Sequence, residues 1–176
     1  MPSEGRSSIA AVNVITLVCA VFWGQYVAMV LVRQTFHTEL SAAVPGGLAF
    51  DAVGGGPFVY LMTGFIIKAL SLAVSIYALW RILTRIAKGK MNSPAVARLC
   101  NVAAFSILAW LSGAFFELMG NNFAANRIGI ESDWTEASLT STSVMIIAWL
   151  LIGVLFVLER AIVSSQELEA EVDGLV

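Results

Sequence analysis

Four apolar segments, each long enough to cross a lipid bilayer, constrain the fold of this chain more than any other feature. The hydrocarbon core of a bilayer is about 30 Å thick, so about 20 helical residues span it. Only 12% of the residues are charged, against about a quarter in soluble domains, and a soluble bundle would need polar faces that these segments lack. We therefore predict an all-α fold, a bundle of four transmembrane helices, with residues 1–176 as one integral membrane domain. The predicted spans are residues 9–32, 57–83, 95–119 and 139–163.

The basic residues predict an orientation, because Lys and Arg are retained on the cytoplasmic side during insertion. The chain has ten Lys and Arg residues. Two of them, Arg33 and Arg127, fall on one side of the predicted membrane, and Lys68 lies inside the second span. We therefore expect both termini and the middle loop to be cytoplasmic. The first segment is longer than the apolar region of a signal peptide, about 7 to 15 residues, so we interpret it as a retained helix. The seven basic residues on the opposite side are Arg6, Arg81, Arg85, Lys88, Lys90, Arg98 and Arg160.

Local sequence signals predict where helices end and begin. Gly89 is expected to end the second long helix, and Ser93 followed by Pro94 is typical of an N-cap and first helical position. The second and third spans should therefore form an antiparallel hairpin with a short connection. Asp133 and Glu136 have the spacing of a capping box, which predicts that the last helix begins at about Trp134.

The segment between the first two spans, residues 34–56, is rich in turn-forming residues but is not wholly polar. Pro45 and several glycines prevent a continuous helix. Leu48, Phe50 and Val53 are too apolar for a solvated linker, so we expect the segment to fold back on the outer surface of the bundle. A flexible connector is the alternative, because glycine also raises chain entropy.

A charged residue in the middle of a span marks a candidate intramembrane site. Lys68 lies near the centre of the second span, where an ammonium group costs about 2.5–3.5 kcal/mol on insertion scales. Glu117 lies inside the third span, near its outer end, at an expected axial offset from Lys68 of about 12 Å. Together with Asn13 and Gln25 these residues form a candidate polar cluster. It serves either to hold the helices together or as a proton or ligand site.

Catalytic and cofactor-binding motifs do not emerge from the sequence. Cys19 and Cys100 are isolated and are expected to pack as small apolar residues, which argues against thiol redox chemistry. His37 is the only histidine, so a bis-histidine haem is excluded, and we interpret it as a surface loop residue. With no phosphate loop, nucleophile elbow or metal-binding pattern, we expect no enzyme activity, no cofactor and no direct contact with nucleic acid.

Two charged surfaces are expected on the cytoplasmic side. The first, which we call the basic elbow, comprises Arg81, Arg85, Lys88, Lys90 and Arg98; it would attract anionic lipid headgroups at about 1 kcal/mol per charge. The second is the acidic tail, which we expect either to be a solvated helical extension or to dock on a basic partner or on the basic elbow. The tail comprises Glu167, Leu168, Glu169, Glu171, Val172 and Asp173.

The elbow and tail resemble a family of small four-helix bacterial integral membrane proteins catalogued as a domain of unknown function. The resemblance implies a bacterial cytoplasmic membrane protein. Genes of that family often lie beside a Cro/CI-type helix-turn-helix regulator, which implies a role as membrane partner or sensor for a transcription factor. The residues that carry the resemblance lie in 76–83, 86–93, 96–99, 158–161 and 167–176.

Two classes of function remain open from the sequence. The first is a non-catalytic regulatory, sensor or binding protein that presents the basic elbow and the acidic tail to a cytoplasmic partner. The second is a small dimeric transporter or channel-like protein that uses Lys68 and Glu117 in its path. Short connections between spans favour the first, because transport sites often use interrupted helices. Small residues four apart, such as Ala109 and Gly113, suit packing within the chain as well as in a homo-oligomer.

Overall fold

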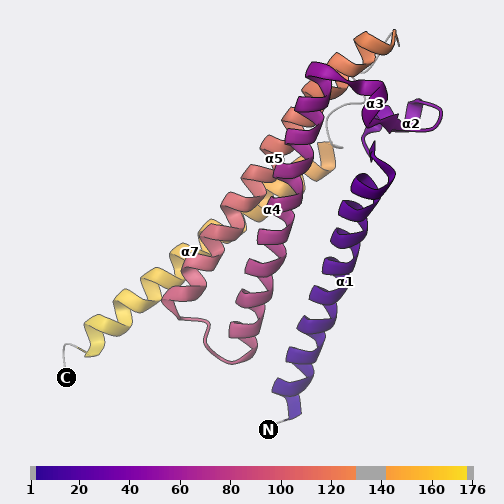
Figure 1. The fold of residues 1–176 in the computed structure, drawn as a ribbon. Coiled ribbons are helices and arrows are strands. Elements are labelled where there is room, and N and C mark those ends of the chain that lie inside the picture. The colour runs from indigo at the N-terminus through magenta and orange to yellow at the C-terminus, as the bar shows by residue number, and fades with distance from the viewer. Residues whose placement is uncertain (1–2, 130–141, 174–176) are drawn as a thin grey trace. The chain divides into compact units, whose positions relative to one another are not determined.

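The chain is a multi-pass membrane protein with the predicted all-α fold class. A computed structural model describes residues 3–129 and 142–173. Four long helices dominate it (Figure 1), and each is long and apolar enough to cross a membrane. They are α1 (Ser3–Arg33), α4 (Gly55–Ala87), α5 (Pro94–Ile128) and α7 (Thr142–Asp173).

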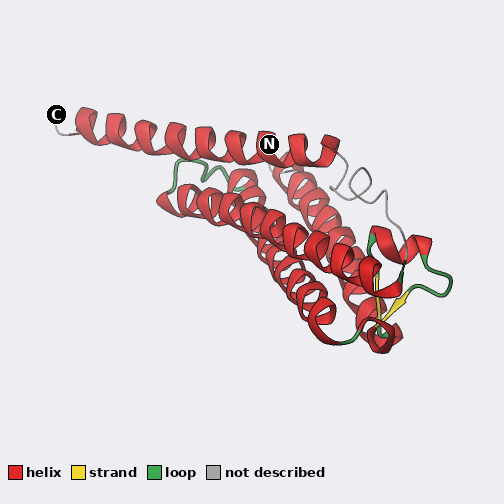
Figure 2. Cartoon of the chain, turned by 90° about the horizontal axis from the view of Figure 1, so that it is seen from above, coloured by secondary structure: helices red, strands yellow, loops and turns green. Residues whose placement is uncertain are grey.

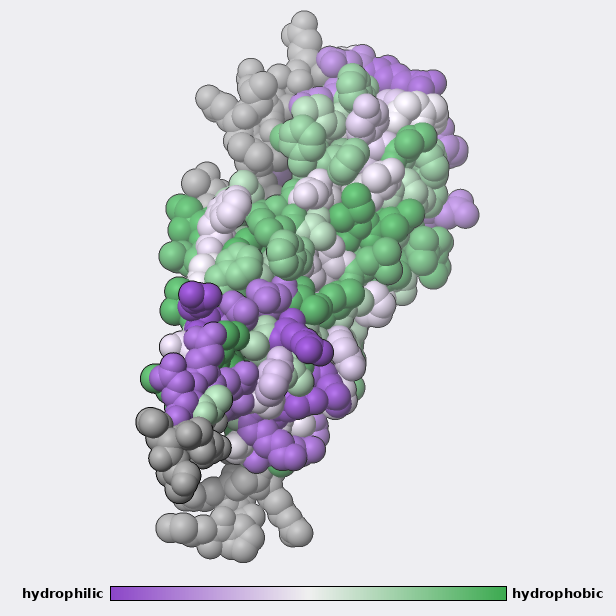
Figure 3. Space-filling model, turned by 90° about the vertical axis from the view of Figure 1, so that its left-hand side faces the viewer, coloured by the Kyte–Doolittle hydropathy of each residue, from purple (hydrophilic) through white to green (hydrophobic). Residues whose placement is uncertain are grey.

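The long helices expose large apolar side chains. On α1, Phe22 is 67% exposed and Val32 is 81% exposed, and Val157 of α7 is 71% exposed. Apolar residues cover continuous areas of the face seen in Figure 3. Apolar area on this scale is unfavourable in water but is satisfied by lipid chains. Contact with the bilayer therefore explains the exposed faces.

The described residues divide into two compact units, and each is treated separately below. The elbow unit takes its residues from 1–21, 73–108 and 147–176. The loop unit takes its residues from 22–72 and 109–146. Helices α1, α4, α5 and α7 contribute residues to both units.

The elbow unit contains the predicted hairpin between α4 and α5. Helix α4 ends at Ala87, and Gly89 follows in the left-handed region at φ +71°. Two backbone bonds close the end of the helix, from the Lys90 amide to the Arg85 carbonyl (2.9 Å) and from the Gly89 amide to the Ile86 carbonyl (2.9 Å). This is a Schellman ending, which glycine favours because it has no Cβ. Helix α5 begins at Pro94, as predicted.

The loop unit contains the segment between α1 and α4, which folds into four short elements. They are β1 (Thr35–Phe36), α2 (Glu39–Ala43), β2 (Leu48–Ala49) and α3 (Phe50–Val53). The two strands pair antiparallel (Figure 2). Thr38 caps α2, because its hydroxyl accepts the Ser41 amide while the Ser41 hydroxyl accepts the Thr38 amide, which is a capping box.

The apolar residues of this segment are buried against the long helices, which confirms that the segment folds back. Phe36, Leu40, Leu48 and Val53 are at most 2% exposed. Burying each such side chain contributes about 1.5–3 kcal/mol, so the segment is a packed part of the loop unit and not a flexible connector. Their partners in the core are Val30 of α1, Leu61, Phe65 and Ala69 of α4, and Ala124 and Ala125 of α5.

Helix α5 continues beyond the predicted third span. The predicted span ended at residue 119, whereas α5 continues to Ile128. Asn121 and Asn122 lower the hydropathy there, but Ala124 and Ala125 lie in the core of the loop unit and hold the additional turns. The expected capping box at Asp133 and Glu136 lies outside the described residues.

Candidate functional site

In the loop unit, α4 and α5 approach so closely that only glycine fits at the contact. A Cβ placed on Gly64 would lie 2.8 Å from the Gly113 carbonyl oxygen and 2.9 Å from the Glu117 backbone nitrogen. One placed on Gly120 would lie 2.7 Å from Leu61 Cγ. Small residues allow this approach in membrane helices. Gly113 therefore serves packing within the chain.

This close approach lets Lys68 of α4 form an ion pair with Glu117 of α5. The ammonium group donates to Glu117 Oε2, and the two side chains are only 16% and 15% exposed. Gly113 lies against Lys68 Cγ, and Glu117 lies against Gly64. The positions of Lys68 and Glu117 along the helix axes therefore differ by about one helical turn. One turn is about 5.4 Å, and the expected offset of about 12 Å was too large. The Lys68 stem spans one turn, so the pair forms directly.

An aromatic ring adds to the environment of Lys68. Its Nζ lies 5.8 Å from the centroid of the Trp110 ring. A cation at this distance is attracted to the negative face of the ring. Glu117 and Trp110 therefore both interact with the Lys68 ammonium group inside an apolar segment.

The other two residues of the predicted cluster have different surroundings. Asn13 Oδ1 accepts a hydrogen bond from Trp80 Nε1 (3.1 Å) within the elbow unit. An indole N–H in apolar surroundings needs an acceptor, so this bond accounts for the position of Asn13. Gln25 is exposed on α1, and it is the next residue, Tyr26, that packs on Phe65. The structure therefore brings Lys68 and Glu117 together and corrects the four-residue cluster.

A polar pocket adjoins the ion pair. Its volume is about 180 Å³. The chain at the capped start of α2 contributes His37, Thr38 and Glu39, and α4 contributes Lys68. Helix α5 contributes Ala114, Glu117, Leu118 and Asn121.

Besides Glu39, the sequence analysis missed Asn121 as a polar residue of this pocket. It is 5% exposed, and its Oδ1 has no hydrogen-bond partner among the described residues. The signal was present, because residues four apart share a helix face and Asn121 follows Glu117 by one turn. It was overlooked because the third span was predicted to end at residue 119. His37, interpreted as a surface loop residue, is exposed and also lines this pocket.

The basic elbow lies in the elbow unit, and Asn92, in the loop between its residues, contacts α7. The Arg85 guanidinium reaches the Ser93 hydroxyl (3.5 Å). The Asn92 side chain donates to Ser165 Oγ (3.2 Å), and the Gln166 side chain donates to the Asn92 carbonyl (2.7 Å). The other four basic residues of the elbow, Arg81, Lys88, Lys90 and Arg98, are exposed.

The acidic tail continues α7 as a helix to Asp173. Its apolar residues Leu168 and Val172 are 60% and 61% exposed, and Glu167 and Glu171 are also exposed. Neither of these two carboxylates forms an ion pair with any residue that the structure describes. The backbone of Glu169 follows the same helix.

The two cysteines differ in environment. Cys100 is fully buried in α5, as expected of a packing residue, but Cys19 is exposed on α1. The expectation that both pack inside the chain is therefore wrong for Cys19. Both are free thiols.

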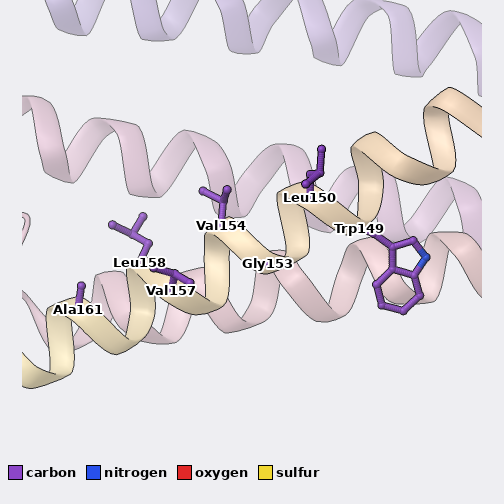
Figure 4. Close-up of a pocket in the computed structure, with 7 residues that line it drawn as sticks. All are labelled: Trp149, Leu150, Gly153, Val154, Val157, Leu158 and Ala161. Carbon is purple, nitrogen blue, oxygen red and sulfur yellow. The ribbon is translucent and has the colours of Figure 1, made fainter.

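A separate groove of about 540 Å³ runs along α7 in the elbow unit (Figure 4). Gly153 lines the groove, and a Cβ placed there would meet no atom within 4 Å. A surface of this composition suits lipid chains. All of the lining residues come from α7, namely Trp149, Leu150, Gly153, Val154, Val157, Leu158 and Ala161.

Comparisons of the chain with family models, with curated proteins and with solved structures find no match.

Proposed function

We propose that this multi-pass membrane protein is a non-catalytic regulatory or binding protein whose acidic tail recruits a cytoplasmic partner. The observation that carries the proposal is that the tail is a helical extension with exposed apolar side chains. Helix α7 contacts Asn92 through Gln166 and then continues to Asp173. Leu168 and Val172, one turn apart on this extension, are largely exposed.

The arrangement of charge and apolar surface on the tail supports a partner. Residues at i and i+4 share one helix face, so Leu168 and Val172 form a short apolar stripe with carboxylates beside it. Such a face suits a partner with an apolar groove and a basic rim. Asn92 donates a hydrogen bond to Ser165 and accepts one from Gln166, and these bonds hold α7 immediately before the tail. This restraint reduces the entropy that binding must overcome.

The proposed orientation places both termini and the basic elbow in the cytoplasm of a bacterium. The excess of Lys and Arg around residues 81–98 supports it through the positive-inside rule. Four exposed basic residues there would also attract anionic headgroups. The resemblance of the elbow and tail to a family encoded beside Cro/CI-type regulators favours a DNA-binding regulator as the partner.

A transporter is the second candidate, because Lys68 and Glu117 form an ion pair inside membrane-spanning helices. Intramembrane charges often mark ion or substrate paths. However, α4 runs unbroken from Gly55 to Ala87 and α5 from Pro94 to Ile128. Because transport sites are often built from interrupted helices, the continuous helices favour the binding protein.

The tail is tested by site-specific crosslinking in cells. A photo-crosslinking amino acid at Leu168 should trap one soluble protein, and the same amino acid at Val157, in the apolar groove of α7, should trap none. Replacing Glu167 and Glu171 with Gln should weaken the crosslink while leaving membrane insertion unchanged, and added salt should weaken binding in a membrane extract. Equal crosslinking from both positions, or a crosslink at Leu168 that is unchanged when Glu167 and Glu171 are both replaced with Gln, would contradict the proposal.

A further inference from the structure

A second pocket of the loop unit lies where α4 begins and α5 ends, and its walls are largely aromatic. Its volume is about 450 Å³. The rings of Tyr60 and Phe123 pack against each other at a centroid distance of 5.3 Å, yet the two side chains remain 37% and 48% exposed. The pocket is therefore accessible from the surface. Its described lining residues are Gly56, Pro57 and Tyr60 of α4 and Phe123, Asn126 and Arg127 of α5.

The position of the two rings along the helices places them at the depth of lipid headgroups. Helix α4 has 33 residues and so is about 50 Å long, whereas the hydrocarbon core is about 30 Å thick. About 10 Å at each end therefore lies at the interface. Tyr60 follows the start of α4 at Gly55, and Phe123 precedes the end of α5 at Ile128, each by about 7–8 Å. Aromatic side chains are enriched at this depth.

The Arg127 guanidinium is held at the edge of the pocket. Its Nη1 donates to the Gly54 carbonyl (2.9 Å), and a Cβ placed on Gly55 would lie 3.0 Å from the same nitrogen. The guanidinium therefore packs on the two residues that directly precede Gly56 of the lining. A guanidinium has five N–H donors, so one bond to Gly54 leaves others for an anion. Arg127 forms no ion pair within the part of the chain that the structure describes.

We propose that this pocket binds one anionic phospholipid, whose phosphate accepts hydrogen bonds from Arg127 and whose acyl chain lies against Tyr60 and Phe123. The planar guanidinium matches the geometry of phosphate oxygens and can donate to two of them at once. Arg127 is the one charged residue among the described lining residues. The lining therefore offers no carboxylate to the ammonium group of a zwitterionic headgroup, which favours a lipid with net negative charge.

The apolar rings distinguish a lipid from a free anion. Inorganic phosphate would contact Arg127 but would leave the aromatic walls without a partner, whereas an acyl chain covers them. Burial of apolar area then adds to the charge-assisted hydrogen bonds. This site does not depend on the tail having a partner.

Native mass spectrometry of the full chain, released from detergent micelles, tests the ligand class. Dioctanoyl phosphatidylglycerol should add one molecule in a saturable way. Dioctanoyl phosphatidylcholine, with the same chains, should bind more weakly, because Arg127 repels its ammonium group. Inorganic phosphate at the same concentration should not displace the phosphatidylglycerol, since it has no acyl chain. Equal binding of the two lipids, or displacement by inorganic phosphate, would overturn the proposal.

A pair of arginine variants tests the headgroup contact. Arg127→Gln should weaken phosphatidylglycerol binding about tenfold or more, because a hydrogen bond to a charged group is lost, and should remove the preference over phosphatidylcholine. Arg33→Gln removes the same charge from the exposed last turn of α1 and should bind like the parent. Equal weakening in both variants would show a general attraction to positive charge and contradict a site at Arg127.

A pair of phenylalanine variants tests the acyl-chain contact and keeps the test open if Arg127→Gln fails to fold. Phe123→Ala should weaken the binding of both lipids, because they share the chain that lies on this ring. Phe115→Ala removes another exposed ring of α5, 55% exposed and outside the described lining, and should have no effect. Unchanged phosphatidylglycerol binding in both Arg127→Gln and Phe123→Ala would refute the assignment.

The same spectra report how many copies of the chain associate. A dimer that forms without lipid and dissociates in Phe123→Ala would assign this surface to a second copy of the chain and overturn the proposal. A monomer that carries one phosphatidylglycerol supports it.

Discussion

Gly64 of α4 and Gly113 of α5 lie face to face in the loop unit. A Cβ on Gly64 would lie 2.8 Å from the Gly113 carbonyl oxygen, and a Cβ on Gly113 would lie 3.0 Å from the Gly64 carbonyl oxygen. Lys68 is one turn from Gly64, and Glu117 is one turn from Gly113. The glycine contact therefore sets the distance between the helices at which the ion pair forms.

We expect Gly64→Ala to destabilise the protein by about 1–3 kcal/mol, because the new methyl group meets backbone atoms of α5 and forces the helices apart. Gly153→Ala in α7 is the matched control. No atom lies within 4 Å of a Cβ there, and Ala is favoured over Gly in a helix by about 1 kcal/mol. Thermal unfolding in detergent, followed by circular dichroism, measures both. Equal effects of the two substitutions would argue against the close approach of α4 and α5.

Lys68→Met should lower the free energy of unfolding, because it leaves Glu117 largely buried without its cation. The expected loss lies toward the lower end of the range of about 3–5 kcal/mol for a broken buried ion pair. From the sequence alone, an apolar replacement of Lys68 is expected to be tolerated. The direct ion pair changes that expectation. The double variant Lys68→Met, Glu117→Met should recover most of the loss, since apolar residues often replace a buried ion pair without cost.

The measurement for Lys68 is a double-mutant cycle of unfolding free energies in detergent, completed by Glu117→Met. A coupling energy near zero between the two sites would show that the pair does not contribute to stability. In that case a lost cellular phenotype in Lys68→Met would favour transport or sensing.

The orientation predicts the access of single cysteines from outside the cell. In a Cys19→Ala background, Ala42→Cys in α2 and Asn126→Cys in α5 should react with an impermeant thiol reagent in intact cells, and Lys90→Cys should not. Cys100 is fully buried, so the background itself serves as the unlabelled control. Labelling of Lys90→Cys alone would show that the chain has the opposite orientation in the membrane.

The sequence by itself determined the spans and several helix ends, because these depend on local properties. Length and hydropathy define an apolar helix whatever its neighbours are. The end of α4 near Gly89 and the start of α5 at Pro94 follow from the backbone preferences of those residues. The apolar residues of 34–56 likewise indicated a packed segment, since burial is the way to remove them from water.

Only the tertiary structure decided which polar residues meet. Hydropathy does not encode how far each helix is rotated or shifted along its axis, and the direct Lys68–Glu117 pair depends on both. The contact between Gly64 and Gly113 fixes that register through close packing. Burial of Ala124 and Ala125 against the loop extends α5 past the predicted end of its span, and so brings Asn121 to the pocket. These contacts join segments far apart in the chain, so no local pattern in the sequence could predict them.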